Sequence, residues 1–202
     1  MKTINLSLMA CALLMLGFIS CKKNDPITPQ PAPKFSKTDS LKTSFNSNES
    51  FTLYDFKNGM VVPNSDSATT KWDVGFNFVN LIINSHSSGP GTAGVITQMV
   101  DASKNITFDG LNMAPESGYA YDTSATKRAI NTDLTAGWYN YNDVTHVFSP
   151  KADRFFIIKT SDNHYVKLEI LKVDYAEFVG YTPVTLIYTF RYTYQPDGSR
   201  NF

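Results

Sequence analysis

The stretch YTFRYTY at residues 188–194 alternates between aromatic and polar side chains along its whole length. In a β-strand successive side chains point to opposite faces of the sheet, so one face of this segment carries only aromatic rings. Those rings belong to Tyr188, Phe190, Tyr192 and Tyr194. We expect this face to lie in a hydrophobic core, and the turn at 196–198 to reverse the chain so that Phe202 packs back onto the sheet.

The same two-residue periodicity recurs upstream. WDVGFNF (72–78) and VKLEI (166–170) alternate, and FFIIK (155–159) is a continuous apolar run. The polar residues 161–165 separate the last two segments, which predicts a hairpin over 155–173. Further strands are expected at 51–56, 79–84 and 146–148, with turn signals such as Asn58-Gly59 between them. Short strands separated by turns predict an all-β fold, a single antiparallel sandwich-like domain with long irregular loops.

Residues 85–143 depart from this pattern. SHSSGPGTAG (85–94) is typical of a loop, and residues 111–141 mix Pro, Gly, Asn and Tyr. Residues 125–131 are a candidate short helix within this region. A compact domain rarely carries so much irregular sequence unless the loops have a function, so we expect the functional residues here.

The first residues have the composition of an export signal. Lys2 precedes an apolar run over 6–20, and the small residue Ser20 stands directly before Cys21. FISC (18–21) is similar to a bacterial lipobox, in which the cysteine carries a lipid; an ordinary signal peptide with a chance cysteine is the alternative. We predict a lipoprotein signal peptide at 1–20, a lipidated Cys21 with a Pro-rich tether at 21–34, and a ligand-binding domain at 35–202.

Charge and motifs exclude several classes of function. The chain has 18 basic and 18 acidic residues among 202, a balance that gives no reason to expect nucleic-acid binding. Gly-rich phosphate loops and nucleophile motifs are missing from the sequence, and His86, His146 and His164 lack metal-binding spacing. We therefore predict a binding protein that catalyses no reaction and has no metal site of its own.

Three fragments, taken in order along the chain, resemble the HmuY family of secreted haem-binding lipoproteins of Gram-negative anaerobes. They are WDVGF (72–76), the predicted hairpin at 155–173, and YTFRYTYQPDGSRNF (188–202). The resemblance implies an all-β fold in which haem lies between loops at one end of the molecule, held by two axial side chains. Some members of the family use a His pair and others Met, so the resemblance does not fix the type of ligand.

Haem iron accepts imidazole nitrogen, thioether sulfur or phenolate oxygen at its axial positions. We take Met113 and His146 as candidate axial ligands, with Met99 as the runner-up. A gap-filling core methionine and a half-buried structural histidine are the alternatives for the first two. Candidates for the haem pocket, each of which could equally belong to the core, are Tyr119, Tyr121, Trp138 and Tyr139. Lys127 and Arg128 are either propionate partners or solvated charges.

With this resemblance the sequence predicts a haem-binding outer-membrane lipoprotein, anchored through Cys21, that serves iron acquisition. Its expected partners are haem, the membrane that holds its lipid, and an outer-membrane receptor to which it passes the haem. The competing interpretation is a structural or adhesive surface lipoprotein of the same fold that binds no haem, or another apolar ligand.

Overall fold

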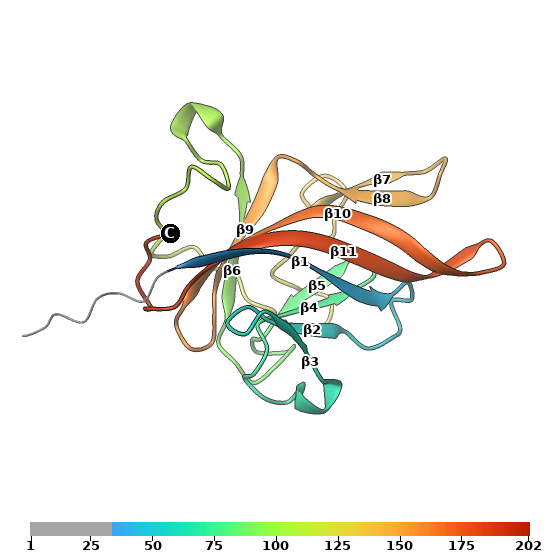
Figure 1. Cartoon of the computed structure of the whole chain (residues 1–202), viewed down its shortest axis with the longest axis horizontal. Helices are drawn as coiled ribbons and strands as arrows, with labels where there is room; N and C mark the ends of the chain where they lie inside the picture. The colour runs from blue at the N-terminus through green and yellow to red at the C-terminus, as the bar shows by residue number, and fades with distance from the viewer. Residues whose placement is uncertain (1–33) are drawn as a thin grey trace, which may run out of the picture. The chain divides into compact units, whose positions relative to one another are not determined.

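The computed structural model describes residues 34–202, which form two antiparallel sheets and a short separate hairpin (Figure 1). The five-stranded sheet has the order β1 (Phe35–Ser44), β11 (Thr182–Gln195), β10 (Tyr165–Val179), β9 (Arg154–Lys159), β6 (Gly94–Met99). The four-stranded sheet has the order β3 (Met60–Val62), β2 (Thr52–Asp55), β4 (Val74–Asn77), β5 (Asn80–Ile83). The third pair is β7 (Tyr139–Asn142) with β8 (Val147–Pro150). The predicted all-β antiparallel class is confirmed, whereas the predicted signal peptide and nearly all of the tether lie outside the described residues.

The main core lies between the two sheets. β11 contributes the aromatic face predicted from the sequence, and all four of its rings are buried. Phe190 meets β2 and β4 of the opposite sheet, with ring centroids 5.1 Å from Tyr54 and 5.6 Å from Phe76. Edge-to-face and offset contacts of this kind contribute beyond the burial of area alone. The closing strand is therefore the aromatic centre of the sandwich.

A second hydrophobic cluster covers the outer face of the five-stranded sheet. Phe155 and Ile157 of β9 point to this side, because they alternate with the core residues Phe156 and Ile158. The segment after β6 folds over them, and Phe202 closes the cluster. The amide of Phe202 donates to the carbonyl of Asn112, 2.8 Å away, so the predicted return of the C-terminus onto the sheet is confirmed.

The chain between β6 and β7 is irregular, as the sequence predicts. It contains one 3-10 turn, η2 (Ala102–Lys104), and isolated bridges, and a second such turn, η1 (Asn64–Asp66), follows β3. The candidate helix at 125–131 is wrong: residues 124 and 127 form an isolated bridge instead. The buried carboxylate of Asp122 accounts for this, because it accepts hydrogen bonds from the amides of Ile83 (3.0 Å) and Ala129 (2.7 Å). Within the described residues, no helix has the length and apolarity to cross a membrane.

Candidate functional site

A cavity of about 600 Å³ lies among the loops beside β5. We call it the loop cavity. Its lining comprises Asn80, Ala120, Tyr121, Thr123, Ala125, Thr126, Lys127, Arg128, Ala129, Ile130, Asn131 and Thr132. Ligand cavities for small molecules in proteins commonly have volumes of roughly 300–1,000 Å³, so the loop cavity has a suitable size. Among the predicted pocket residues, Tyr121 is the one that lines it, together with Lys127 and Arg128.

Backbone pairing with β6 positions Tyr121. Val95 and Ala120 exchange backbone hydrogen bonds of 3.0 and 2.9 Å, which extends the sheet by one bridge. The buried residue Asp122 fixes the chain on the other side of Tyr121. Close approach here requires Gly94, because a Cβ at that position would lie 2.8 Å from Cβ of Tyr119. Tyr121 is thus held between two anchored neighbours and remains 42% exposed.

In and beside the loop cavity lie side chains that can coordinate iron and side chains that carry positive charge. His86, in the loop after β5, does not line the loop cavity but packs edge-to-face against Tyr121, with the ring centroids 5.3 Å apart. Arg128 lies 5.3 Å above the ring of Phe51, and burial lowers the pKa of its guanidinium from the ordinary value. A phenol and an imidazole can bind haem iron, and Lys or Arg can pair with carboxylates.

The two predicted axial ligands lie on different parts of the molecule. Met113 forms an isolated bridge with Asn201, next to the C-terminal residue, and is 53% exposed. His146 lies in the turn between β7 and β8, where its Nδ1 is 2.9 Å from the hydroxyl of Tyr141. The C-terminus and the β7–β8 hairpin are on opposite sides of the domain (Figure 1). The structure therefore does not bring Met113 and His146 together, and their role as a ligand pair stays a prediction.

The remaining candidates divide between surface and core. Met99 is exposed at the end of β6. Trp138 and Tyr139 are buried in the main core, and the indole of Trp138 donates to the carbonyl of Val79 over 3.0 Å. Tyr119 is half-buried against the second cluster, with its hydroxyl 2.9 Å from the carbonyl of Pro115. Trp138 and Tyr139 thus lie in the core and Tyr119 is half-buried, whereas Tyr121 lines a cavity.

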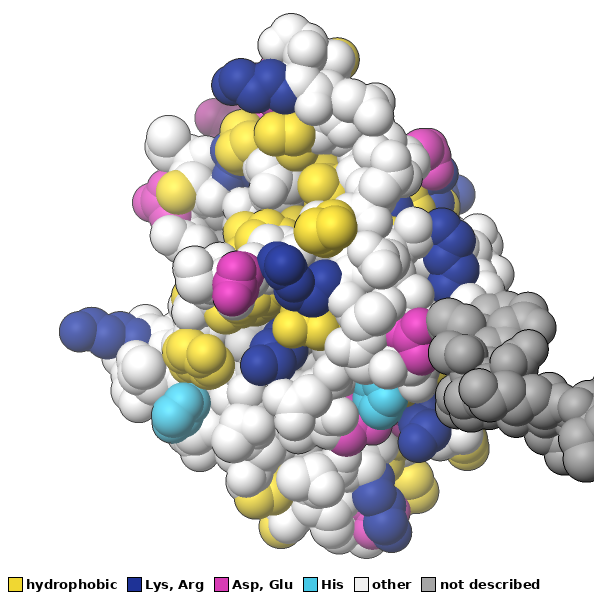
Figure 2. Space-filling view, turned by 90° about the vertical axis from the view of Figure 1, so that its left-hand side faces the viewer, with side chains coloured by type: hydrophobic (Ala, Val, Ile, Leu, Met, Phe, Trp, Pro, Cys, Tyr) yellow, Lys and Arg dark blue, Asp and Glu magenta, His cyan; other side chains and the backbone are white. Residues whose placement is uncertain are grey.

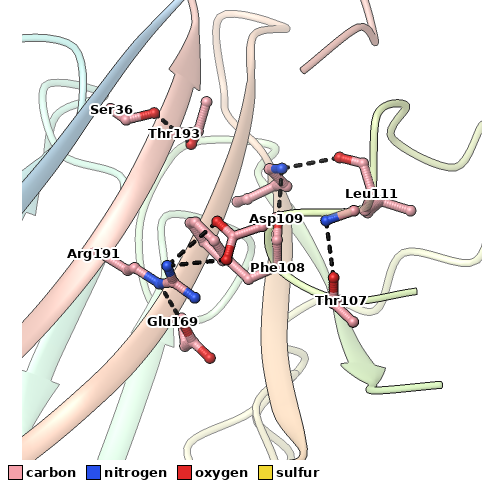
Figure 3. Close-up of polar contacts among 10 residues, drawn as sticks. Ser36, Thr107, Phe108, Asp109, Leu111, Glu169, Arg191 and Thr193 are labelled. Atoms are coloured by element: carbon pink, nitrogen blue, oxygen red, sulfur yellow. Dashed lines mark hydrogen bonds and ion pairs between the residues drawn. The ribbon is translucent and has the colours of Figure 1, made fainter. Parts of the chain in front are cut away.

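A second, strongly basic cavity of about 370 Å³ lies over β1 and β11, and its cations Arg191 and Lys167 already have partners. Arg191 is ion-paired with Glu169 and Asp109 and lies 4.2 Å from the ring centroid of Phe108 (Figure 3). The buried amine of Lys167 donates to the carbonyls of Phe108 (2.6 Å) and Leu111 (2.9 Å), and burial lowers its pKa to about 8. These contacts fasten the segment 107–111 to the sheet, which is a structural role.

The end of the molecule where the C-terminus lies presents a surface of mixed apolar and charged side chains (Figure 2). Figure 2 shows this end face-on, with hydrophobic side chains gathered over its upper half and Lys, Arg and acidic side chains among them. The exposed side chain of Met113 belongs to the same end, since it pairs with Asn201. An apolar surface mixed with charges is common on proteins and does not by itself define a site.

The described residues form an all-β domain with a cavity among its loops. A sequence model described as "HmuY protein" matches residues 47–192, and the chain belongs to the HmuY family. No curated protein matches the chain. The predicted family membership is thereby confirmed.

Three solved structures are similar to this chain at low sequence identity. An apo HmuY analog (TFO) from Tannerella forsythia is 14% identical, covers 82% of this chain and 98% of its own, and has a TM-score of 0.51. Apo PinO from Porphyromonas gingivitis is 12% identical over 80% of this chain and 98% of its own, with a TM-score of 0.49. An HmuY-like haem-binding protein from Bacteroides vulgatus is 13% identical over 78% and 92%, with a TM-score of 0.47. The similarity to the Tannerella protein supports the fold.

Proposed function

We propose that this protein binds haem in the loop cavity and passes it to an uptake receptor, without catalysing a reaction. The observation that carries the proposal is the family match over residues 47–192, combined with a cavity of about 600 Å³ in the irregular region. The export signal and Cys21 support a lipid-anchored location in the cell envelope. Haem here is cargo, so the protein needs to bind, shield and release it.

The residues of the loop cavity fit the chemistry of haem. The flat macrocycle needs apolar walls, and Ala125 and Ala129 contribute to them. Its two propionates carry negative charge, which Lys127 and Arg128 would balance. Tyr121 and His86 are the iron-binding side chain types at this place, and iron would supply the coordination bonds that fix the orientation of the ring. These residues do not define an axial pair, because Tyr121 lines the loop cavity and His86 lies beside it.

The axial ligands predicted from the sequence form an alternative set. Met113, His146 and Met99 are all exposed side chains near or within the irregular region, which supports access to a ligand. A site that used Met113 with His146 would need a rearrangement of at least one of the two segments. Thioether ligation would also favour ferrous over ferric haem, because sulfur is the softer donor.

Titration with hemin, followed by the Soret absorbance band, tests the proposal. We expect a saturable shift at one equivalent, and a spectrum that stays unshifted would refute haem binding and favour the structural or adhesive interpretation. Tyr121→Phe and His86→Ala should change the axial signature if the loop cavity is the site. Matched controls are Tyr181→Phe, a fully exposed tyrosine of the β10–β11 hairpin, and His164→Ala, whose ring pairs with Asp162.

The same titration distinguishes the two ligand sets. Met113→Ala and His146→Ala should leave the spectrum unchanged if the loop cavity alone binds haem. A changed spectrum in those two variants, with a normal spectrum in Tyr121→Phe, would instead support the ligands predicted from the sequence. Weaker binding by Lys127→Ala at low salt would support its pairing with a propionate, because such pairs are screened by ions.

A further inference from the structure

A third cavity, of about 470 Å³, lies at the edge of the four-stranded sheet, where the β9–β10 turn meets the segment after β3. We call it the acidic cavity. Its lining comprises Asp55, Lys57, Asn58, Met60, Val61, Val62, Pro63, Asp66, Thr70, Lys71, Asp73, Ser161, Asp162 and Tyr194. It joins two sequence fragments that carried the family resemblance, because Asp73 follows Trp72 and Tyr194 ends the aromatic alternation of β11.

The charge around the acidic cavity is unbalanced. Four aspartates line it, against two lysines. Lys71 is already paired with Asp66 at 3.1 Å, and Asp162 lies 2.8 Å from the imidazole of His164. Asp55 is occupied by backbone amides of its own turn. The carboxylate that remains with least compensation is Asp73.

Asp73 is only 9% exposed, and its carboxylate has few polar partners. Its Oδ2 accepts one hydrogen bond, from the amide of Phe56 at 2.8 Å, and no ion pair reaches it within the described residues. Burial, with the charges of Asp55 and Asp162 adding to it, raises the pKa of Asp73 to about 7. A buried carboxylate without a cation is costly, so a cation placed in the acidic cavity would stabilise it.

Tyr194 supplies the second, independent observation. It is 1% exposed and lines the acidic cavity, yet its hydroxyl has no hydrogen-bond partner. Burial raises the pKa of this hydroxyl, and the carboxylates of Asp162, Asp73 and Asp55 add to the effect. Buried polar groups are normally satisfied, so an orphaned hydroxyl beside a cavity points to a missing partner.

The wall of the acidic cavity restricts the type of cation. Within residues 34–202, no group of three or more His, Cys, Asp or Glu side chains has metal-binding geometry. One side of the cavity is apolar, formed by the run from Met60 to Pro63. We propose that the acidic cavity binds a small organic cation, a primary ammonium group on a short apolar body, with Asp73 and Tyr194 as its polar partners. This site is separate from the loop cavity and does not depend on haem binding.

Calorimetric titration with three probes of nearly equal shape tests this proposal. Benzylammonium should bind saturably at one equivalent to the purified protein, benzyl alcohol should bind at least tenfold more weakly, and benzoate should not bind. This order follows because only the ammonium can form a charge-assisted hydrogen bond with a carboxylate. Equal binding of all three probes, or no binding of benzylammonium, would overturn the proposal.

Variants then locate the site. Asp73→Asn should weaken benzylammonium binding by about 10- to 100-fold, and Tyr194→Phe by about three- to tenfold, as expected for a charged and a neutral hydrogen bond. Tyr192→Phe is the matched control, because Tyr192 lies on the same face of β11 but lines the basic cavity. Thermal melts of each variant show whether it folds. An affinity that is unchanged in folded Tyr194→Phe and Asp73→Asn would refute the assignment.

Discussion

The substitution Asp73→Asn should change the pH dependence of the free energy of unfolding, because Asp73 is a buried carboxyl with a strongly raised pKa. Asp73 is almost fully buried, and its pKa is raised from the ordinary 3.8 to about 7. Asparagine has nearly the same shape, and its side-chain oxygen can still accept the hydrogen bond from the amide of Phe56. The variant therefore removes an ionisation and keeps the local geometry.

The sign of the effect follows from linkage. The folded state holds the proton of Asp73 more tightly than the unfolded chain, so this group stabilises the fold fully below about pH 4. That stabilisation is lost as the pH rises through about 7, because the unfolded carboxyl ionises freely while the folded one resists. A difference between 3.8 and about 7, at about 1.4 kcal/mol for each pKa unit, corresponds to about 4 kcal/mol.

Urea unfolding of both proteins at intervals from pH 4 to pH 9 measures this effect. The free energy of unfolding of the wild type minus that of Asp73→Asn should fall by about 4 kcal/mol between pH 4 and 7 and then stay level. Using the difference removes the contributions of other carboxylates, such as Asp39 and Asp101, whose pKa values are lowered by hydrogen bonds and ion pairs. Parallel stability curves would show that Asp73 is ionised in the fold without penalty, and would refute the reasoning.

Three further predictions concern packing, backbone strain and the loop cavity. Phe190→Ala should cost about 3–5 kcal/mol in urea unfolding, because the ring is fully buried; a cost below about 1 kcal/mol would contradict its central place in the core. Gly59→Ala should destabilise more than Gly180→Ala, since both have φ near +60° but only Gly59 has a neighbour, the Tyr192 hydroxyl, 2.8 Å from an added Cβ. Equal losses would indicate strain alone. Asp122→Ala should cost about 2–3 kcal/mol and weaken hemin binding, and unchanged hemin affinity would separate the loop cavity from haem.

The strands that the sequence predicts most clearly are rich in apolar side chains. YTFRYTY buries its aromatic face in the main core, as its alternation predicts. The apolar run at 155–159 and the segment 74–77 are buried on both faces, so apolar content rather than alternation identifies them. β1 was missed for a physical reason: it pairs with β11 at the sheet edge, and most of its side chains are polar and exposed. Phe35–Ser44 is a strand because its backbone pairs with β11, and its own sequence gives little indication of this.

The candidate site was harder to predict, because contacts between distant segments build it. The bridge between Val95 and Ala120 and the carboxylate of Asp122 set the position of Tyr121, and none of these contacts has a local sequence signal. Met113 and His146 both look like loop ligands in the sequence, yet the chain carries them to opposite sides of the domain. Composition can name the side chains that suit haem iron, whereas topology decides which of them meet.

Charge separates the two cavities that we propose as ligand sites. The loop cavity has Lys127 and Arg128 in its wall, whereas the acidic cavity has four aspartates against two lysines. Hemin carries two propionates, so the acidic cavity would repel it even though its volume is comparable. An organic ammonium is instead attracted by the aspartates of the acidic cavity and repelled by the cations of the loop cavity. Electrostatic complementarity therefore assigns each ligand to one cavity, and volume alone would have favoured neither.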